Sequence, residues 1–220
     1  MIEALLSDID GTLVDSNWLH AEAWQKSFEI IGINLELEAV RRQIGKGGDQ
    51  LIPIFVPWWK RPAVEQPLEA YRKFLFQTQY LAQVRPLPRV REFLVSIQKH
   101  GIRVALASSA SQEDLLAYKK IARIEDLVDS DTSANDAARS KPHPDIFAAS
   151  LHKLGVAPQN ALALGDTPYD AEAAGKAGVS TIGVTTGGWD EAELLDAGCI
   201  EVYRDVSDLL DRFEQSALVR

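Results

Sequence analysis

The chain has 220 residues, of which 46% are hydrophobic and 25% charged, and its formal net charge at pH 7 is -9. This composition suits a folded core, and the acidic balance disfavours nucleic acid as a partner, because binding phosphate backbones requires a basic surface. No signal peptide or run of 18 apolar residues is present, and the single Cys199 cannot form an internal disulfide. We therefore expect a cytoplasmic protein without a membrane partner, a monomer by default with a dimer left open.

The first informative stretch is a short apolar run that ends in two carboxylates and a glycine. Residues 4–6 favour a buried strand, and Asp8 and Asp10 follow it before Gly11 lets the backbone turn sharply. Alternation along a strand points both acids to the same side, where two carboxylates of ordinary pKa about 3.9 repel each other. The pair therefore requires a cation or a shared proton. A solvated turn after an edge strand is the alternative.

Residues 15–85 have the pattern of helices and contain no convincing strand. Apolar residues recur at three- and four-residue spacing over 18–31. A shorter helix is predicted over 35–44, and helical periodicity resumes over 67–84. We expect a small helical domain.

Beyond residue 85 strands and helices alternate. Strands are predicted over 102–107, 127–128, 161–164, 179–184 and 200–203, and helices over 90–99, 112–122, 144–154, 169–177, 191–197 and 206–213. Such alternation is typical of parallel βαβ units, and only this region offers partners for the N-terminal strand. The sequence therefore predicts an α/β core of residues 1–14 and 86–220, with residues 15–85 inserted in it.

Three further polar clusters lie where predicted strands end or helices begin. Ser108 and Ser109 precede a helix, which is typical of an N-terminal cap but also creates an anion site of free N–H groups. Lys141 stands just before two prolines, and a lone lysine is usually a solvated surface charge. Asp166 and Asp170 follow another strand, where a helix cap and a first-turn acid are the ordinary roles.

These acids, placed beside the first pair, would form a cluster of carboxylates at one sheet edge. At an effective dielectric constant of 20, each like-charge pair at 4 Å costs on the order of 4 kcal/mol. A hard cation bound by oxygen ligands, such as Mg²⁺, would relieve that repulsion. The cluster therefore predicts a magnesium site.

In chain order the four clusters resemble the four motifs of the haloacid dehalogenase-like (HAD) hydrolases, in particular the β-phosphoglucomutase/phosphoglycolate phosphatase-like branch. The strings are Asp-Ile-Asp-Gly-Thr-Leu-Val-Asp-Ser from Asp8, Ser-Ser from Ser108, Lys-Pro-His-Pro-Asp-Ile-Phe from Lys141, and Gly-Asp-Thr-Pro-Tyr-Asp from Gly165. The resemblance implies an α/β fold, with a Rossmann-like parallel sheet core and an inserted α-helical cap domain. It also implies Mg²⁺ as the cofactor and a small phosphorylated metabolite as the substrate.

The resemblance implies roles for the motif residues as well. Asp8 would attack phosphorus and become an aspartyl phosphate, while Asp10, protonated at rest, would act as general acid and then general base. The transferring phosphoryl group would be bound by Ser108, Ser109 and Lys141. Dehalogenases and phosphonatases lack an acid at the position of Asp10, so phosphoryl transfer is the expected chemistry.

The implied metal ligands are the four acids of the first and fourth motifs. Asp10 would contribute its backbone carbonyl, while Asp166 would bind the metal and Asp170 would support it. The set is Asp8, Asp10, Asp166 and Asp170.

Substrate selection would fall to the cap. His20 matches the spacing of the branch, where a histidine lies near the cap hinge, and Lys46 and Gly47 lie in a loop that could reach the substrate. A histidine on a helix face and a charged loop tip are the alternatives. Trp58 and Trp59 are expected to be buried anchors of the cap.

The preferred function is a phosphatase of a sugar phosphate or phosphoglycolate. The loop 45–49 lacks the arginine after a single glycine that a mutase is expected to carry. A β-phosphoglucomutase-like phosphomutase is the first alternative. A nonenzymatic binding or regulatory protein on the same fold is the second.

Overall fold

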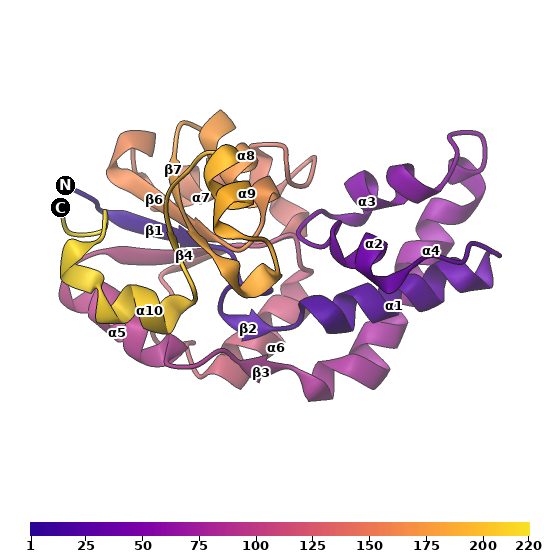
Figure 1. The fold of residues 1–220 in the computed structure, drawn as a ribbon, viewed down its shortest axis with the longest axis horizontal. Coiled ribbons are helices and arrows are strands. Elements are labelled where there is room, and N and C mark those ends of the chain that lie inside the picture. The colour runs from indigo at the N-terminus through magenta and orange to yellow at the C-terminus, as the bar shows by residue number, and fades with distance from the viewer.

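The apolar run near the N-terminus forms the middle of a six-stranded sheet. The computed structural model describes residues 1–220, and its strand β1 (Ala4–Ser7) lies between β4 (Arg103–Ala107) and β6 (Ala161–Gly165) (Figure 1). The order is β5-β4-β1-β6-β7-β8, and all neighbours are parallel. Burial on both faces explains why these strands are almost continuously apolar. The predicted α/β fold with a parallel sheet is confirmed.

The register brings the ends of the central strands to one edge. Ser7 of β1 pairs with Leu106 of β4 and with Leu164 of β6. The residues that follow these strands therefore emerge side by side at the carboxyl edge of the sheet, which is where open α/β sheets bind ligands.

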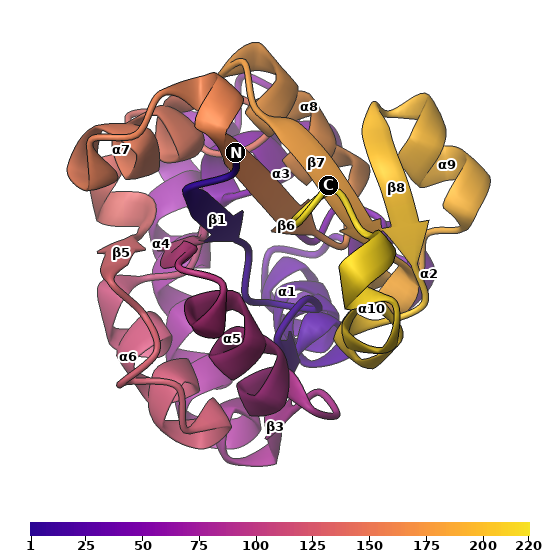
Figure 2. The ribbon, with the colours of Figure 1, turned by 90° about the vertical axis from the view of Figure 1, so that its left-hand side faces the viewer.

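Helices cover both faces of the sheet (Figure 2). Leu5 of β1 belongs to an apolar cluster with α5, α6 and α10, whereas Leu6 points to the opposite face and packs with α7 and α8. The remaining elements of this α/β core are β5 (Ser130–Thr132), β7 (Ser180–Val184), β8 (Cys199–Tyr203), α5 (Val90–Lys99), α6 (Gln112–Ala122), α7 (Asp145–Leu154), α8 (Pro168–Lys176), α9 (Glu191–Asp196) and α10 (Val206–Asp211).

One predicted strand of the core is wrong. Leu127 and Val128 lie in the connection after α6, and the strand begins later, at Ser130. Leu127 is buried and Val128 packs against the larger apolar cluster. These two residues are apolar because they fill the core from a loop, and strand pairing does not account for them.

A helical lobe stands apart from the sheet, at the right of Figure 1. Its elements are α1 (Asn17–Ile30), α2 (Leu37–Arg41), α3 (Gly48–Phe55), α4 (Arg61–Leu75) and a π-helical turn (Phe76–Tyr80). The lobe has its own apolar cluster, in which Trp24 packs against Phe28.

The junction between lobe and core contains a strand pair that the sequence pattern did not indicate. β2 (Val14–Asp15) and β3 (Arg85–Pro86) pair antiparallel, with two residues each. Strands this short carry no periodicity, so only the fold reveals them. No helix in the structure combines the length and apolar character needed to cross a bilayer.

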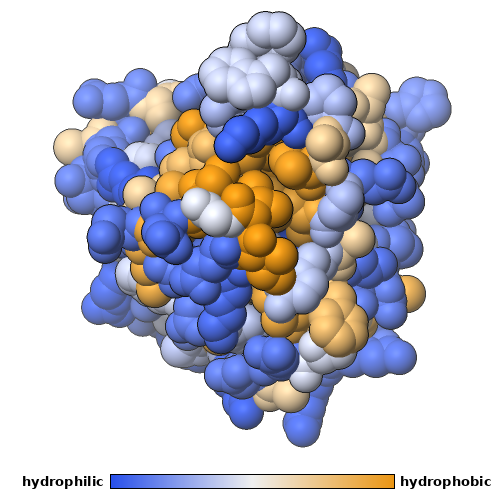
Figure 3. Space-filling model, turned by 90° about the vertical axis from the view of Figure 1, so that its right-hand side faces the viewer, coloured by the Kyte–Doolittle hydropathy of each residue, from blue (hydrophilic) through white to orange (hydrophobic).

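The expectation that Trp58 and Trp59 anchor the lobe from inside is wrong. Their exposed fractions are 73% and 64%, and their rings pack edge to face on each other in the connection between α3 and α4. The interior is already filled by Trp24, Phe28 and aliphatic residues. Figure 3 shows apolar side chains gathered on this end of the molecule, where Ile54 is also exposed.

Candidate active site

A buried lysine joins two of the predicted acids. Asp8 follows β1 directly, and the Nζ atom of Lys141 lies 2.5 Å from its Oδ1 and 2.6 Å from Oδ1 of Asp170. Only 1% of Lys141 is exposed. Burial alone would lower the pKa of Lys141, but the carboxylates of Asp170 and Asp8 outweigh burial and raise it. The side chain is therefore an ammonium ion clamped at the strand edge.

A third acid completes a buried carboxylate cluster. Ligand oxygens of Asp8, Asp166 and Asp170 lie within 4.8 Å of one another. Thr12 Oγ1 donates to one oxygen of Asp166 at 2.9 Å, and Asn17 Nδ2 donates to the other at 2.7 Å. Three carboxylates face a single ammonium group here, and hard oxygen donors of this kind fit Mg²⁺.

Burial dominates the proton affinity of this cluster. It raises the pKa of Asp166 to about 7, with a further contribution from Asp170. It also raises the pKa of Asp8 well above the ordinary value, although Lys141 opposes the shift. A cation at the cluster would favour the ionised forms of both.

The side chain of Asp10 points away from this cluster. Ser16 Oγ donates to its Oδ1 at 2.6 Å, and His20 Nε2 lies 2.9 Å from the same oxygen. Tyr118 places its hydroxyl 2.9 Å from His20 Nε2. The carboxylate of Asp10 is thus outside the oxygen cluster, and the predicted metal contact of its backbone carbonyl stays a prediction.

This surrounding also corrects the expectation that Asp10 is protonated at rest. Burial alone would raise the pKa of Asp10, but the charge of protonated His20 and hydrogen bonds from His20, Ser16 and Tyr118 outweigh it, so the pKa is lowered. That expectation rested on the resemblance to the family and on the like charge of Asp8. It had no means of seeing the donors that converge on Asp10.

Neither of the two serines that directly follow β4 caps helix α6. Ser108 is buried and its Oγ accepts a hydrogen bond from the Ala110 N–H at 3.0 Å, while Ser109 Oγ is 3.4 Å from the Gly45 carbonyl oxygen. The helix cap of α6 is Ser111, which accepts from the Asp114 N–H. Ser108 and Ser109 therefore remain at the sheet edge, where an anion would lie.

The lobe reaches the same place through the loop before α3. Lys46 and Gly47 line a small pocket together with Asp8 and Asp10. Lys46 Nζ donates to Gln43 Oε1 at 2.7 Å and lies 4.2 Å from the ring centroid of Tyr169. The lysine is therefore tethered beside the pocket.

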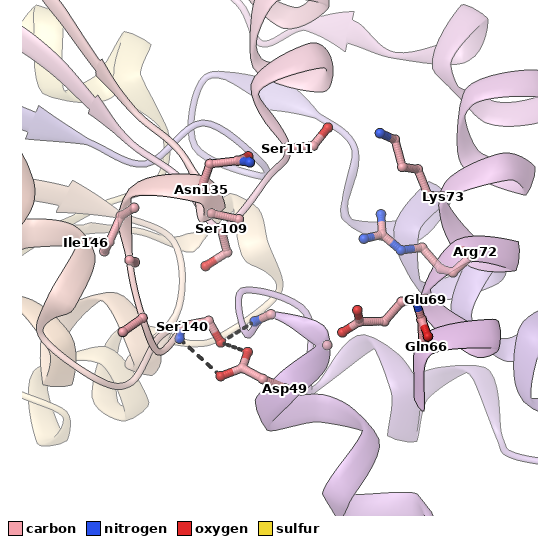
Figure 4. A pocket seen from close by; sticks show the side chains of 16 residues that line it. Asp49, Gln66, Glu69, Arg72, Lys73, Ser109, Ser111, Asn135, Ser140 and Ile146 are labelled. Atoms are coloured by element: carbon pink, nitrogen blue, oxygen red, sulfur yellow. Dashed lines mark hydrogen bonds between the residues drawn. The ribbon is translucent and has the colours of Figure 1, made fainter. Parts of the chain in front are cut away.

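The next residues of this loop bind the core next to Lys141. The Gly47 N–H donates to Ser140 Oγ at 2.9 Å, and Ser140 donates to the Asp49 carboxylate (Figure 4). His20, on α1, stacks on Phe76 with ring centroids 3.8 Å apart. All three predicted lobe residues thus lie at the pocket.

Several residues at the site were not predicted. Thr12 and Asn17 hold Asp166, and they stand in or just after the first motif, so their position was a usable signal. Tyr118 and Arg72 lie on helices with ordinary amphipathic patterns. No local signal distinguishes them, because only tertiary packing brings them to the pocket.

The fold and site define an α/β protein with an acidic, lysine-bridged centre at the carboxyl edge of a parallel sheet, faced by a helical lobe. The family model of the haloacid dehalogenase-like hydrolases matches residues 5–184, and the chain belongs to this family. The family expected from the four motifs is confirmed, and with it the expectation of a hydrolase.

Relatives of known name cover nearly the whole chain. The phosphorylated carbohydrates phosphatase of Thermotoga maritima is 27% identical over 207 residues, covering 92% of this chain and 94% of that protein. The phosphoglycolate phosphatase of Escherichia coli strain K12 is 28% identical over 239 residues, covering 95% and 91%.

Solved structures share the fold over similar lengths. A hydrolase from Pseudomonas syringae superposes with a TM-score of 0.89 at 25% identity, covering 98% of this chain and 99% of that one. A β-phosphoglucomutase from Clostridium difficile has a TM-score of 0.79 at 22% identity, covering 98% and 96%, which is a likeness of fold.

Proposed function

We propose that this chain is a Mg²⁺-dependent phosphatase that hydrolyses a small phosphorylated metabolite through an aspartyl phosphate on Asp8. The observation that carries the proposal is the contact of Asp8 with the buried ammonium of Lys141, inside a cluster of three carboxylates at the sheet edge. Family membership and the named phosphatase relatives support the same chemistry.

Each group at the sheet edge has a task in this mechanism. Asp8 attacks phosphorus, and Lys141 stabilises the negative charge of the transferring oxygens. Ser108 and Ser109 donate hydrogen bonds to the same oxygens. Mg²⁺, held by the oxygens of the carboxylate cluster, would offset the charge between nucleophile and phosphoryl group.

Asp10 moves the proton. Because Asp10 is ionised at rest, it first takes up the proton of the singly protonated phosphate ester and passes it to the leaving oxygen. In the second half of the reaction it accepts a proton from the attacking water. Ser16 and His20 both contact its Oδ1, so its carboxylate is held in one orientation. The other carboxylate oxygen is the one left to face the substrate.

We also infer that residues 15–85 act as a cap inserted in the core of residues 1–14 and 86–220. The helical lobe has its own apolar cluster, and the short β2–β3 pair marks where the chain leaves and re-enters the core. The loop with Lys46 and Gly47 lines the pocket that contains Asp8. The cap would therefore shield the reaction from bulk water and contact the substrate.

The loop 45–49 does not gain from its neighbours the arginine that is expected of a phosphomutase. The two arginines that precede the loop 45–49 are turned toward the core, where Arg41 donates to the Gly187 carbonyl and Arg42 pairs with Glu193. Neither is free to bind a phosphate at the pocket.

The test is phosphate release from a panel of sugar phosphates, phosphoglycolate and nucleotides with Mg²⁺, beside Asp8→Asn and an EDTA control. Release that requires both Asp8 and Mg²⁺ is the expected result. Conversion of β-glucose 1-phosphate to glucose 6-phosphate without phosphate release would establish the mutase. Failure of both reactions with folded protein would favour a nonenzymatic role.

A further inference from the structure

A large cavity adjoins the catalytic pocket. It measures about 500 Å³ and lies between α4 and the start of α3 on the lobe and the loops after β4 and β5 on the core (Figure 4). Gly47, Ser109 and Arg72 line both this cavity and the small pocket that contains Asp8 and Asp10. A phosphoryl group at Asp8 would occupy the small pocket only. Cavities of ~300–1,000 Å³ accommodate molecules far larger than a two-carbon acid.

The cavity contains an arginine without a partner. Arg72 forms no ion pair, and its Nε atom is buried with no hydrogen-bond acceptor. The next residue, Lys73, is engaged with Glu113 at 3.1 Å. The guanidinium of Arg72 lies 5.2 Å from the ring centroid of Trp24 and points from α4 into the cavity (Figure 4). A buried donor without an acceptor is unfavourable unless a ligand supplies one.

Other charged groups at this place do not satisfy Arg72. Asp49 is bound to Ser140, and Glu69 lies against Gly48, where an added methyl group would come within 2.0 Å of its Oε1. Lys46 lines only the small pocket. Arg72 is therefore placed to contact the part of the substrate beyond the phosphoryl group.

We propose that Arg72 binds a second acidic group, a carboxylate or a phosphate, at the far end of the substrate. This inference rests on the proposed phosphatase function and narrows its substrate class to phosphorylated sugar acids or sugar bisphosphates. A guanidinium presents a planar fork of donors that matches two oxygens of such a group. Asn135, also in the cavity wall, is placed to bind a hydroxyl group between the two ends.

The test compares kcat/KM for two matched pairs of substrates with Mg²⁺. The pairs are 6-phosphogluconate with glucose 6-phosphate, and fructose 1,6-bisphosphate with fructose 6-phosphate. The proteins are the wild type, Arg72→Gln, Arg72→Lys and Arg91→Gln, an exposed arginine on α5 that pairs with Asp126 far from the cavity. Thermal unfolding confirms that each variant is folded.

The wild type should prefer the doubly acidic member of at least one pair by about 10-fold or more, as expected for charge-assisted hydrogen bonds. A preference in the first pair would show that Arg72 binds a carboxylate, and a preference in the second pair would show that it binds a phosphate. Arg72→Gln should bring the ratio near one, mainly through KM, because Arg72 contacts a non-reacting part of the substrate. Arg72→Lys should retain part of the preference, and Arg91→Gln should retain all of it.

Equal kcat/KM within both pairs for the wild type, or a preference that survives in Arg72→Gln, would overturn the assignment. Absence of any phosphate release by the wild type would be a failure of the phosphatase proposal itself. Calorimetric titration of the same doubly acidic compounds then decides about Arg72 separately. Binding that disappears in Arg72→Gln supports the site, and binding that is absent or unchanged rejects it.

Discussion

The ammonium group of Lys141 lies 2.5 Å from Oδ1 of Asp8, and both side chains are buried. Because Lys141 also contacts Asp170, its removal would leave two buried carboxylates without their counter-charge. Breaking a buried ion pair in this way typically destabilises a protein by about 3–5 kcal/mol. We therefore expect Lys141→Met to lower the free energy of unfolding by that amount in EDTA, and Mg²⁺ to restore part of it.

Urea unfolding of the variant with and without Mg²⁺ measures this effect. Lys73→Met is the matched control, since its surface ion pair with Glu113 should contribute less than about 1 kcal/mol. If Lys141→Met were no less stable than this control in EDTA, the clamp between Lys141 and the two acids would not exist in solution.

A second prediction concerns the arginine that ties the lobe to the core. Arg41 is buried, and its Nη1 donates to the Gly187 carbonyl oxygen at 2.5 Å while Glu38 pairs with the other side of the guanidinium. Arg41→Met removes this contact across the interface. We expect a larger radius of gyration in small-angle X-ray scattering and a fall in kcat/KM of about 10-fold or more, since a charge-assisted hydrogen bond is lost.

Arg61→Met tests whether the loss of any arginine that binds backbone carbonyls has the same effect. Arg61 also binds backbone carbonyls, those of Val56 and Pro53, but both lie within the lobe. This control should leave the radius of gyration unchanged. An equal expansion in both variants would mean that Arg41 does not hold the lobe against the core.

A third prediction follows from the buried thiol of Cys199. Burial, with a smaller effect of Asp170, raises its pKa to about 12, whereas an unfolded thiol has a pKa of about 8.5. The folded state therefore favours the neutral thiol. That contribution is fully present below pH 8.5 and is lost progressively as the pH rises toward 12, because the unfolded chain releases its proton first.

The measurement compares the free energy of unfolding of the wild type and Cys199→Ala at pH 8.5 and pH 9.5. The wild type should lose about 1 kcal/mol more than the variant over this interval. Iodoacetamide should also label native protein slowly and urea-unfolded protein rapidly at pH 9. Rapid labelling of the native protein would show that the thiol is accessible and ionised.

The parts of the site that could be predicted from the sequence are those with local causes. Asp8, Ser108 and Asp166 each follow an apolar strand, and level strand ends in a parallel sheet bring them together. Lys141 could be predicted as a site residue because two prolines follow it and complete the motif. The alternation of strands and helices predicted the fold for the same reason, since each strand is buried on both faces.

The parts that could not be predicted depend on contacts between distant segments. Tyr118 and His20 are hydrogen-bonded although they lie 98 positions apart in the sequence, and no local pattern around either residue predicts this contact. The exposure of Trp58 could not be foreseen either, because it depends on whether Trp24 and Phe28 already fill the lobe.

In the proposed mechanism Asp8 becomes phosphorylated during turnover. Rapid acid quenching during steady-state hydrolysis, followed by peptide mass spectrometry, detects such an intermediate. We expect one phosphoryl group on the peptide that contains Asp8, dependent on Mg²⁺ and absent in Asp8→Asn. Steady turnover with no phosphorylated peptide, or with the phosphoryl group on another residue, would contradict it.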